Sequence, residues 1–231
     1  MATHLVTGAG SGIGTAVAAA LHARGDDLVL LARTVERADE LAERFPGCRT
    51  IVVDLADPDA VDRIDGIPER LDSLLHVAGI VELATVAELD TRHLREQLDV
   101  NLVSPALLTR ACLPAIRAAQ GLVVFVNSSA GLSVGTSWAA YGASKFGLRA
   151  LADALRAEEM GHGVRVTTVF PSRTATPMQE KVHEQEGRTY DSSRWISPET
   201  VAATIVHVID LPRDATIPEV TVRPLVPWSP R

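Results

Sequence analysis

The sequence predicts an α/β protein in which helices cover both faces of a doubly wound, seven-stranded parallel sheet. Three observations support this fold class. Short apolar runs alternate with longer amphipathic stretches to about residue 222, the runs are apolar at consecutive positions, and no linker interrupts the alternation. Strands of this kind are typically buried on both faces, as in a doubly wound sheet. Residues 1–231 are therefore expected to form a single domain.

The expected strands and helices alternate in chain order. Seven β-branched or Leu-rich runs are the expected strands: residues 3–7, 28–31, 49–53, 73–77, 122–127, 164–169 and 217–222. Helical patterns lie between them at residues 12–24, 35–44, 57–65, 88–117, 138–160 and 198–209. Residues 177–195 are polar and charged, which predicts an irregular segment. A substrate lid is the hypothesis for this segment, and a solvated connector is the alternative.

Composition excludes several classes of protein. With 46% hydrophobic and 22% charged residues, the chain can build a full core and is not intrinsically disordered. The formal net charge of −7 disfavours nucleic acid or an anionic membrane as partner. Apolar runs such as 122–126 are far shorter than the ~20 residues that span a bilayer. The positions of Cys48 and Cys112 match neither a metal site nor a disulfide framework, so we expect no metal and a reducing compartment. Because no leader is expected before the first strand, we expect a cytoplasmic protein.

A glycine-rich run joins the first strand to the first helix. Glycines at these positions permit a tight turn and a close approach to a ligand, while the helix N-terminus offers free N–H groups to a pyrophosphate. Glycine also marks ordinary turns, but the place of this run between strand and helix favours dinucleotide binding. The expected contacts are Gly8, Ser11, Gly12, Ile13 and Gly14.

The end of the second strand indicates which cofactor is preferred. An acidic residue there would select NAD by binding the ribose 2′-hydroxyl, but this strand ends in Ala32-Arg33-Thr34. The guanidinium of Arg33 suits a 2′-phosphate, so NADP(H) is expected to be preferred, with NAD(H) as a possible cofactor. The alternative is that Arg33 is a solvated loop residue.

Two further strand ends are expected to contact the cofactor, because ligands bind at the carboxyl ends of strands in open α/β sheets. Asp54-Leu55 follows the third strand, and the Asp54 carboxylate could accept a hydrogen bond from the adenine amino group or cap the helix near Pro58. Ala78-Gly79 follows the fourth strand, where small residues allow the cofactor to lie close to the backbone.

Four residues form a candidate catalytic constellation. Tyr141 and Lys145 are four residues apart on one helix and share a face. A neighbouring ammonium is expected to lower the tyrosine pKa from its usual ~10, which suits an acid or base. Ser128 ends the fifth strand and could bond the substrate oxygen. Asn101, in the long fourth helix, could reach Lys145 through a water.

These features resemble the short-chain dehydrogenase/reductase family over essentially the whole chain. The resemblance rests on Thr7-Gly8-x-x-x-Gly12-x-Gly14, Asp54-Leu55, Ala78-Gly79, Asn101, Ser128, Tyr141-x-x-x-Lys145 and the segment 171–176. It implies a Rossmann fold with strand order 3-2-1-4-5-6-7. It also implies a catalytic tetrad of Asn101, Ser128, Tyr141 and Lys145, with Tyr141 as general acid/base and Lys145 holding the nicotinamide ribose. Pro171, Thr174 and Thr176 would line the nicotinamide.

Two positions depart from the family pattern. The family commonly has two asparagines where this chain has His76-Val77, and glycine where this chain has Ser172. Neither position belongs to the tetrad. His76 could be a catalytic histidine, although a hydrogen-bonded histidine at a strand end is the favoured interpretation. Trp138, Met178 and Trp195 are candidates for a substrate pocket, with core or interface positions as the alternative.

The predicted function is the interconversion of a small-molecule carbonyl and an alcohol with NADP(H). The alternative is a catalytically silent protein of the same fold that binds NADP(H) as a sensor or scaffold. An intact tetrad favours the enzyme, because a sensor has no chemical need for it. The resemblance also implies a homodimer or homotetramer paired through residues 88–117 and 138–160, where Ala150 and Ala154 would allow close helix packing.

Overall fold

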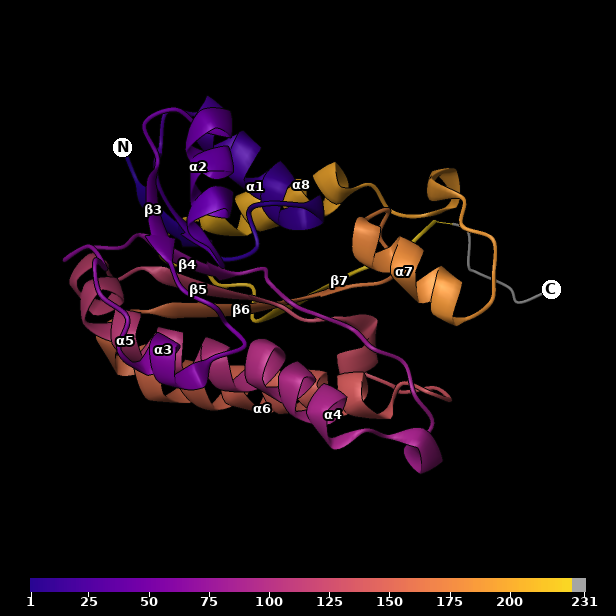
Figure 1. Ribbon diagram of the computed structural model, residues 1–231. Helices are drawn as coiled ribbons and strands as arrows, with labels where there is room; N and C mark the ends of the chain where they lie inside the picture. Colours follow the sequence, from indigo (N-terminus) through magenta and orange to yellow (C-terminus); the bar gives the residue numbers. More distant parts are fainter. Residues whose placement is uncertain (226–231) are drawn as a thin grey trace.

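A computed structural model describes residues 1–225 and contains the predicted parallel sheet (Figure 1). Its strand order is β3-β2-β1-β4-β5-β6-β7, and every neighbouring pair is parallel. The strands are β1 (Thr3–Val6), β2 (Asp27–Ala32), β3 (Arg49–Val52), β4 (Ser73–His76), β5 (Leu122–Val126), β6 (Arg165–Pro171) and β7 (Glu219–Val222). The predicted fold class, the strand positions and the strand order are confirmed.

Helices cover both faces of the sheet (Figure 1). One face carries α1 (Gly12–Ala23), α2 (Val35–Arg44) and α8 (Pro198–Ile209). The other carries α3 (Pro58–Asp62), α4 (Thr91–Leu98), α5 (Ser104–Ala119) and α6 (Ala139–Glu159), and α7 (Pro177–Gln185) lies past the end of β6. Short turns complete the described chain: η1 (Val86–Glu88), η2 (Asp99–Val103), η3 (Ser129–Gly131), η4 (Met160–His162) and η5 (Ser192–Arg194).

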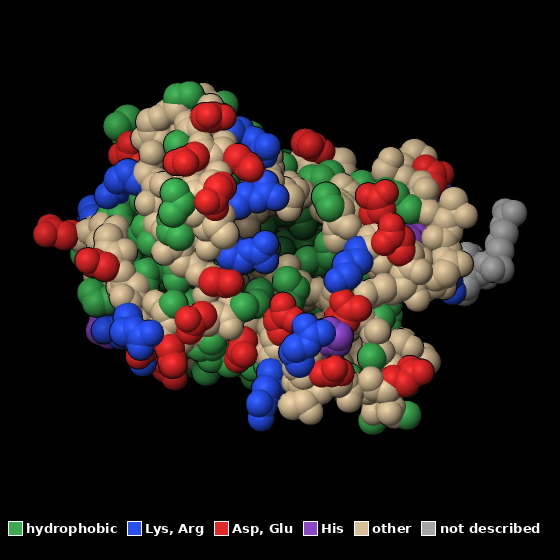
Figure 2. Space-filling model, viewed as in Figure 1, with side chains coloured by type: hydrophobic (Ala, Val, Ile, Leu, Met, Phe, Trp, Pro, Cys, Tyr) green, Lys and Arg blue, Asp and Glu red, His purple; other side chains and the backbone are tan. Residues whose placement is uncertain are grey.

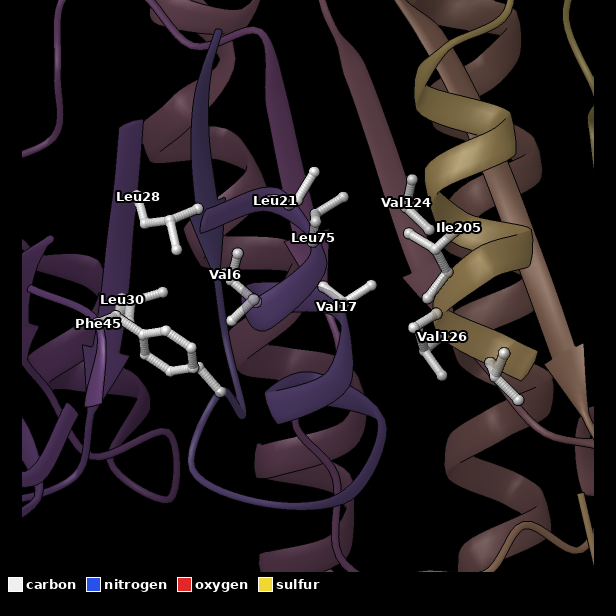
Figure 3. Packing of buried hydrophobic residues seen from close by; sticks show 14 of the residues in the cluster. Val6, Val17, Leu21, Leu28, Leu30, Phe45, Leu75, Val124, Val126 and Ile205 are labelled. Carbon is white, nitrogen blue, oxygen red and sulfur yellow. The ribbon is translucent and has the colours of Figure 1, made fainter. Parts of the chain in front are cut away.

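Each face of the sheet has its own apolar core. Successive strand side chains point to opposite faces, so Val6 packs toward α1 and α8 while Leu5 packs toward α5 and α6. Figure 3 shows the first cluster, in which Val124 and Val126 of β5 lie beside Ile205 of α8. The central strands are therefore apolar at consecutive positions, whereas the edge strands β3 and β7 are partly exposed.

The long helix expected at residues 88–117 is interrupted. A π-turn, η2, separates α4 from α5 and contains Asn101. By length and composition alone, Thr91–Ala119 would be long and apolar enough to cross a membrane, but this is weak evidence for a membrane span because a buried core helix passes the same test. Its apolar side chains Leu108, Cys112 and Ile116 are fully buried against the sheet, which accounts for that composition.

The expectation of an irregular segment over residues 177–195 is wrong for its first half, which forms α7. The Thr176 hydroxyl caps this helix by accepting a hydrogen bond from the Gln179 N–H at 3.3 Å. Pro177 occupies the first helical position, where its missing N–H has no cost. Val182 and His183 are buried. The Thr-Pro capping signal outweighs the scarcity of apolar residues, and only residues after α7 are largely irregular.

Candidate functional site

A cavity of about 860 Å³ lies at the carboxyl ends of the central strands. Figure 2 shows this hollow between the part of the molecule that carries α1 and α2 and the part around α7. Most of the predicted site residues line it: Gly8, Ser11, Gly12, Ile13, Gly14, Ala78, Gly79, Ser128, Tyr141, Lys145, Pro171, Thr174 and Thr176. Segments distant in the sequence thus meet at one site, as expected for a doubly wound sheet.

The glycine loop forms a cradle that side chains would fill. Gly8 and Gly12 have φ values of +75° and +51°, in the left-handed region that favours glycine. A Cβ on Gly14 would lie 2.0 Å from the Gly8 carbonyl oxygen, so the start of α1 packs directly on the loop. Ser11 precedes α1 without capping it through its side chain. The first N–H groups of α1 are thus available to an anion, and the loop fits a dinucleotide pyrophosphate.

Substitution of Gly14 tests whether the start of α1 packs directly on the backbone of the glycine loop. We expect Gly14→Ala to lower the free energy of unfolding by about 1–3 kcal/mol, because the new methyl group meets backbone that cannot move without distorting the loop. Gly10→Ala is the matched control, since a Cβ there meets no atom within 4 Å, and it should change stability by less than about 0.5 kcal/mol. Denaturant unfolding of both variants measures the difference, and equal stabilities would contradict this packing.

Thr7 joins the glycine loop to the loop after β4. Its hydroxyl oxygen accepts hydrogen bonds from the Val77 and Ala78 N–H groups, each at 3.0 Å. A Cβ on Gly8 would lie 2.8 Å from the Ala78 nitrogen, so the two loops touch through backbone. Thr7 belongs to the glycine motif described above, but its hydrogen bonds to the loop after β4 were not predicted. Its partners lie 70 and 71 positions further along the sequence, where no local pattern points to them.

Asn127 is a structural residue of the site that the sequence reading missed. It is buried and follows β5. Its Nδ2 donates to the Lys145 carbonyl at 2.9 Å, and its Oδ1 accepts from the Ser128 N–H at 2.8 Å. The side chain therefore holds α6 against the end of β5 and sets the spacing between Ser128 and Tyr141. A polar residue at the end of a wholly apolar strand was the available signal.

Asn101 lies behind the site and does not line the cavity. Its Oδ1 accepts from the Ile80 N–H, and its Nδ2 donates to the Ile80 carbonyl, both at 2.9 Å. Nδ2 also donates to the Ser144 hydroxyl at 3.0 Å. This buried amide ties the loop after β4 to α6, and the π-turn places it there. The water link from Asn101 to Lys145 stays a prediction.

Tyr141 and Lys145 share a face of α6 at the floor of the cavity. The Lys145 Nζ lies 5.7 Å from the centroid of the Tyr141 ring and donates to the Val126 carbonyl at 3.1 Å. Both side chains are buried. Tyr141 also contacts the Ser128 side chain. The predicted proximity of these three residues is present in the structure.

The expected direction of the tyrosine pKa shift is wrong in this structure. Burial raises the pKa of Tyr141 to about 12, and a hydrogen bond with Ser128 opposes the rise only in part. Burial likewise lowers the pKa of Lys145 to about 8. Loss of solvent disfavours the charged form of each group, which raises the pKa of the phenol and lowers that of the ammonium. At neutral pH the site therefore holds a phenol beside an ammonium.

Besides Asn101, which was also a predicted cofactor contact, three such residues lie outside the cavity lining: Arg33, Asp54 and Leu55. Arg33 is exposed directly after β2. The Asp54 carboxylate accepts from the Ala56 N–H at 2.9 Å, whereas Asp57 caps α3 through the Ala60 N–H. The alternative that Asp54 caps this helix is thus wrong. The binding roles of the three residues stay predictions.

His76 is a core residue. Its ring stacks on Phe125 at 4.8 Å between centroids, and its Nε2 lies 2.8 Å from the Thr109 hydroxyl. Burial lowers the pKa of His76 to about 3, so it stays neutral at physiological pH. These contacts confirm that His76 is a hydrogen-bonded histidine at a strand end.

The candidate residues for a substrate pocket lie at the cavity, whereas the two cysteines do not line it. Trp138, Met178 and Trp195 line the cavity, and the Trp138 ring meets the Tyr141 ring edge-on at 5.6 Å. Cys48 and Cys112 are free thiols. Within residues 1–225 no three His, Cys, Asp or Glu side chains gather where they could hold a metal ion.

Comparison with known proteins agrees with this architecture. The family model described as short chain dehydrogenase matches residues 2–187. An uncharacterized short-chain type dehydrogenase/reductase of Sinorhizobium fredii is 33% identical over 226 residues, which cover 95% of this chain and 90% of that protein.

Solved structures give the same result. A putative NAD(P)-dependent gluconate 5-dehydrogenase from Beutenbergia cavernae with bound NADP is 30% identical, with a TM-score of 0.81 over 95% of this chain and 94% of that one. An alcohol dehydrogenase from Thermococcus sibiricus, complexed with 5-hydroxy-NADP, shares the fold along the full length of both chains, with a TM-score of 0.85 at 22% identity. The chain therefore belongs to the short-chain dehydrogenase/reductase family of NAD(P)-dependent oxidoreductases.

Proposed function

We propose that this protein is an NADP(H)-dependent enzyme that interconverts a carbonyl and an alcohol, with Tyr141 as general acid/base. The observation that carries this proposal is the placement of the Tyr141 phenol next to Ser128 and Lys145, in the cavity whose other end is the glycine cradle. A sensor or scaffold would need only the cradle. The bound NADP of the Beutenbergia cavernae relative supports the choice of cofactor.

Each residue has a distinct part in the proposed reaction. When bound, the cofactor's nicotinamide supplies or accepts the hydride. Ser128 holds the substrate oxygen by a hydrogen bond, and the phenol of Tyr141 donates its proton to that oxygen during reduction. The Lys145 ammonium stabilises the phenolate that remains, and it holds the nicotinamide ribose. In the oxidation direction the phenolate form of Tyr141 accepts the proton of the alcohol.

The cavity wall around Tyr141 favours a substrate with an apolar substituent and disfavours a cationic one. Around Tyr141 its wall is formed by Val81, Ala130, Trp138, Met178 and Val182. No Asp or Glu among the described residues lines it, so a cationic substrate would find no counter-charge. Met178 and Val182 belong to α7, which supports the hypothesis that residues 177–195 cover the substrate.

Turnover assays test the proposed function. NADPH consumption is measured with a panel of aldehydes and ketones that carry aryl, alkyl, carboxylate or ammonium substituents. We expect turnover with aryl and alkyl carbonyl compounds and little with the ammonium compounds. Saturable NADPH binding without turnover on any member would favour the sensor instead.

Arg33 provides the test of cofactor choice. We expect NADPH to be preferred over NADH by at least about tenfold in kcat/KM, because a charge-assisted hydrogen bond contributes roughly 1.5–3 kcal/mol. Arg33→Ala should remove most of the preference, and Ala32→Asp should shift it toward NADH by adding a ribose acceptor and charge repulsion. Equal kcat/KM values for both cofactors in the unmodified enzyme would identify Arg33 as a solvated loop residue.

We also propose a homodimer or homotetramer paired through residues 88–117, which include α4 and α5, and through residues 138–160, which include α6. Ala150 and Ala154 are exposed on α6, and Phe146 on the same helix exposes 43% of its surface. Small residues permit close helix approach, and an exposed aromatic ring gains from burial. Sedimentation velocity at micromolar concentration should show a dimer or tetramer, and Phe146→Asp should shift it toward the monomer. A wild-type monomer would contradict the proposal.

A further inference from the structure

Arg44, at the end of α2, contacts the glycine loop from outside the cavity. Its Nη1 donates to the Gly10 carbonyl at 3.4 Å, across 34 residues of sequence. Both residues are exposed. The space beside Gly10 is open, because a Cβ built there meets no atom within 4 Å. A guanidinium thus lies at the rim of the cradle with room for a ligand beside it.

The other charged groups of α2 leave Arg44 available. Glu40 lies four residues before Arg44, at the spacing of a helical ion pair, but its carboxylate pairs with Arg37 instead. Within residues 1–225 Arg44 makes no ion pair, and its polar contact is the Gly10 carbonyl. Since a guanidinium carries five N–H donors, this single bond leaves several donors for an anion.

The neighbouring positions indicate which part of the cofactor would lie there. A pyrophosphate would bind at the start of α1, and the adenosine ribose would reach the end of β2. The 2′-position of this ribose would therefore lie between the glycine loop and Arg33. Ser11, the loop residue on that side, is small and uncharged. Figure 2 shows Lys and Arg side chains gathered at the edge of the hollow next to α1 and α2.

We propose that Arg44 is a second binding residue for the cofactor 2′-phosphate, in addition to Arg33, and that it supplies positive charge beside the uncharged Ser11. This inference rests on the proposed preference for NADP(H). In this arrangement the Gly10 carbonyl holds the guanidinium at the loop, and the remaining N–H groups meet the phosphate oxygens. The preference for NADP(H) over NAD(H) then depends on Arg44 at the end of α2 together with Arg33 after β2, rather than on Arg33 alone.

Calorimetry with two nucleotides tests this role without turnover. Adenosine 2′,5′-bisphosphate carries the 2′-phosphate, and adenosine 5′-monophosphate does not. We expect Arg44→Ala to weaken binding of the bisphosphate by roughly five- to tenfold, the range for an exposed charge-assisted contact, and to leave binding of the monophosphate unchanged. The ratio of kcat/KM for NADPH and NADH should fall by the same factor, with kcat at saturating NADPH unchanged.

Arg37→Ala is the matched control, because Arg37 is an exposed arginine of the same helix that is already paired with Glu40. It should leave both affinities as in the wild type. Equal weakening of both nucleotides by Arg44→Ala would mean that Arg44 only supports the loop, and no weakening would mean that it stays in solvent. Either result overturns the inference.

The same titrations separate this inference from the proposed cofactor preference. If the wild type favours the bisphosphate, and Arg33→Ala but not Arg44→Ala removes that preference, the role of Arg44 fails and the NADP(H) preference stands. If the wild type binds the two nucleotides equally, the NADP(H) preference itself fails, and the role of Arg44 with it.

Discussion

Tyr141→Phe is expected to lower kcat by at least about 100-fold, because general acid/base catalysis typically contributes ~10² to 10⁴. The variant keeps the ring that packs against Trp138 and removes only the proton that moves in the reaction. Cofactor affinity should therefore stay near that of the wild type. Steady-state kinetics and fluorescence titration with NADPH measure the two effects.

The chain supplies its own control for this experiment, because it contains one other tyrosine, Tyr190. Tyr190 lies beyond α7, where its ring contacts His183 edge-on at 5.3 Å. Tyr190→Phe keeps that ring contact and should retain most of the turnover. A loss of less than about tenfold in Tyr141→Phe would exclude this residue as the acid/base.

Lys145→Ala is expected to reduce both turnover and cofactor affinity, because the ammonium stabilises the phenolate and holds the ribose in the proposed mechanism. A drop in kcat/KM of about 100-fold or more corresponds to the loss of roughly 3 kcal/mol of transition-state stabilisation. Lys181 is the one other lysine. It is exposed and pairs with Glu82 at 2.7 Å, so Lys181→Ala is the matched control.

The pH profile distinguishes the charge of Lys145 from its bulk. Its pKa of about 8 means that the ammonium is present below pH 8 and is lost as the pH rises further. Tyr141, with a pKa of about 12, stays protonated throughout this range. The kcat/KM for carbonyl reduction should thus be level below pH 8 and fall above it. In Lys145→Ala this fall should disappear, whereas a rate that increases above pH 8 would contradict the proposed role.

The sequence alone was enough to predict the architecture, because its signals are local. A strand buried on both faces must be apolar at consecutive positions, and a glycine loop must combine small residues with the start of a helix. The spacing of Tyr141 and Lys145 places them on one face of any α-helix. Each of these rules involves residues a few positions apart. The strand order, by contrast, came from the family resemblance.

Contacts between distant segments were decided only by the tertiary structure. Thr7 accepts hydrogen bonds from a loop about 70 residues away, and Asn127 donates one to the backbone of α6. Arg44 of α2 donates a hydrogen bond to the Gly10 carbonyl. No local pattern marks such partners, because a side chain's partner depends on how whole elements pack.

In the chemistry of the site, too, the sequence predicted which residues take part, and the tertiary structure decided their properties. The sequence identified Tyr141 and Lys145 and suggested an ammonium that lowers the tyrosine pKa. In the structure the pKa of Tyr141 is raised instead, because both groups are buried and the loss of solvent disfavours the charged form of each. The sequence predicts where each strand ends, and the residues at these ends are the ones that meet in the cavity. How strongly each holds its proton depends on the water that the folded chain excludes.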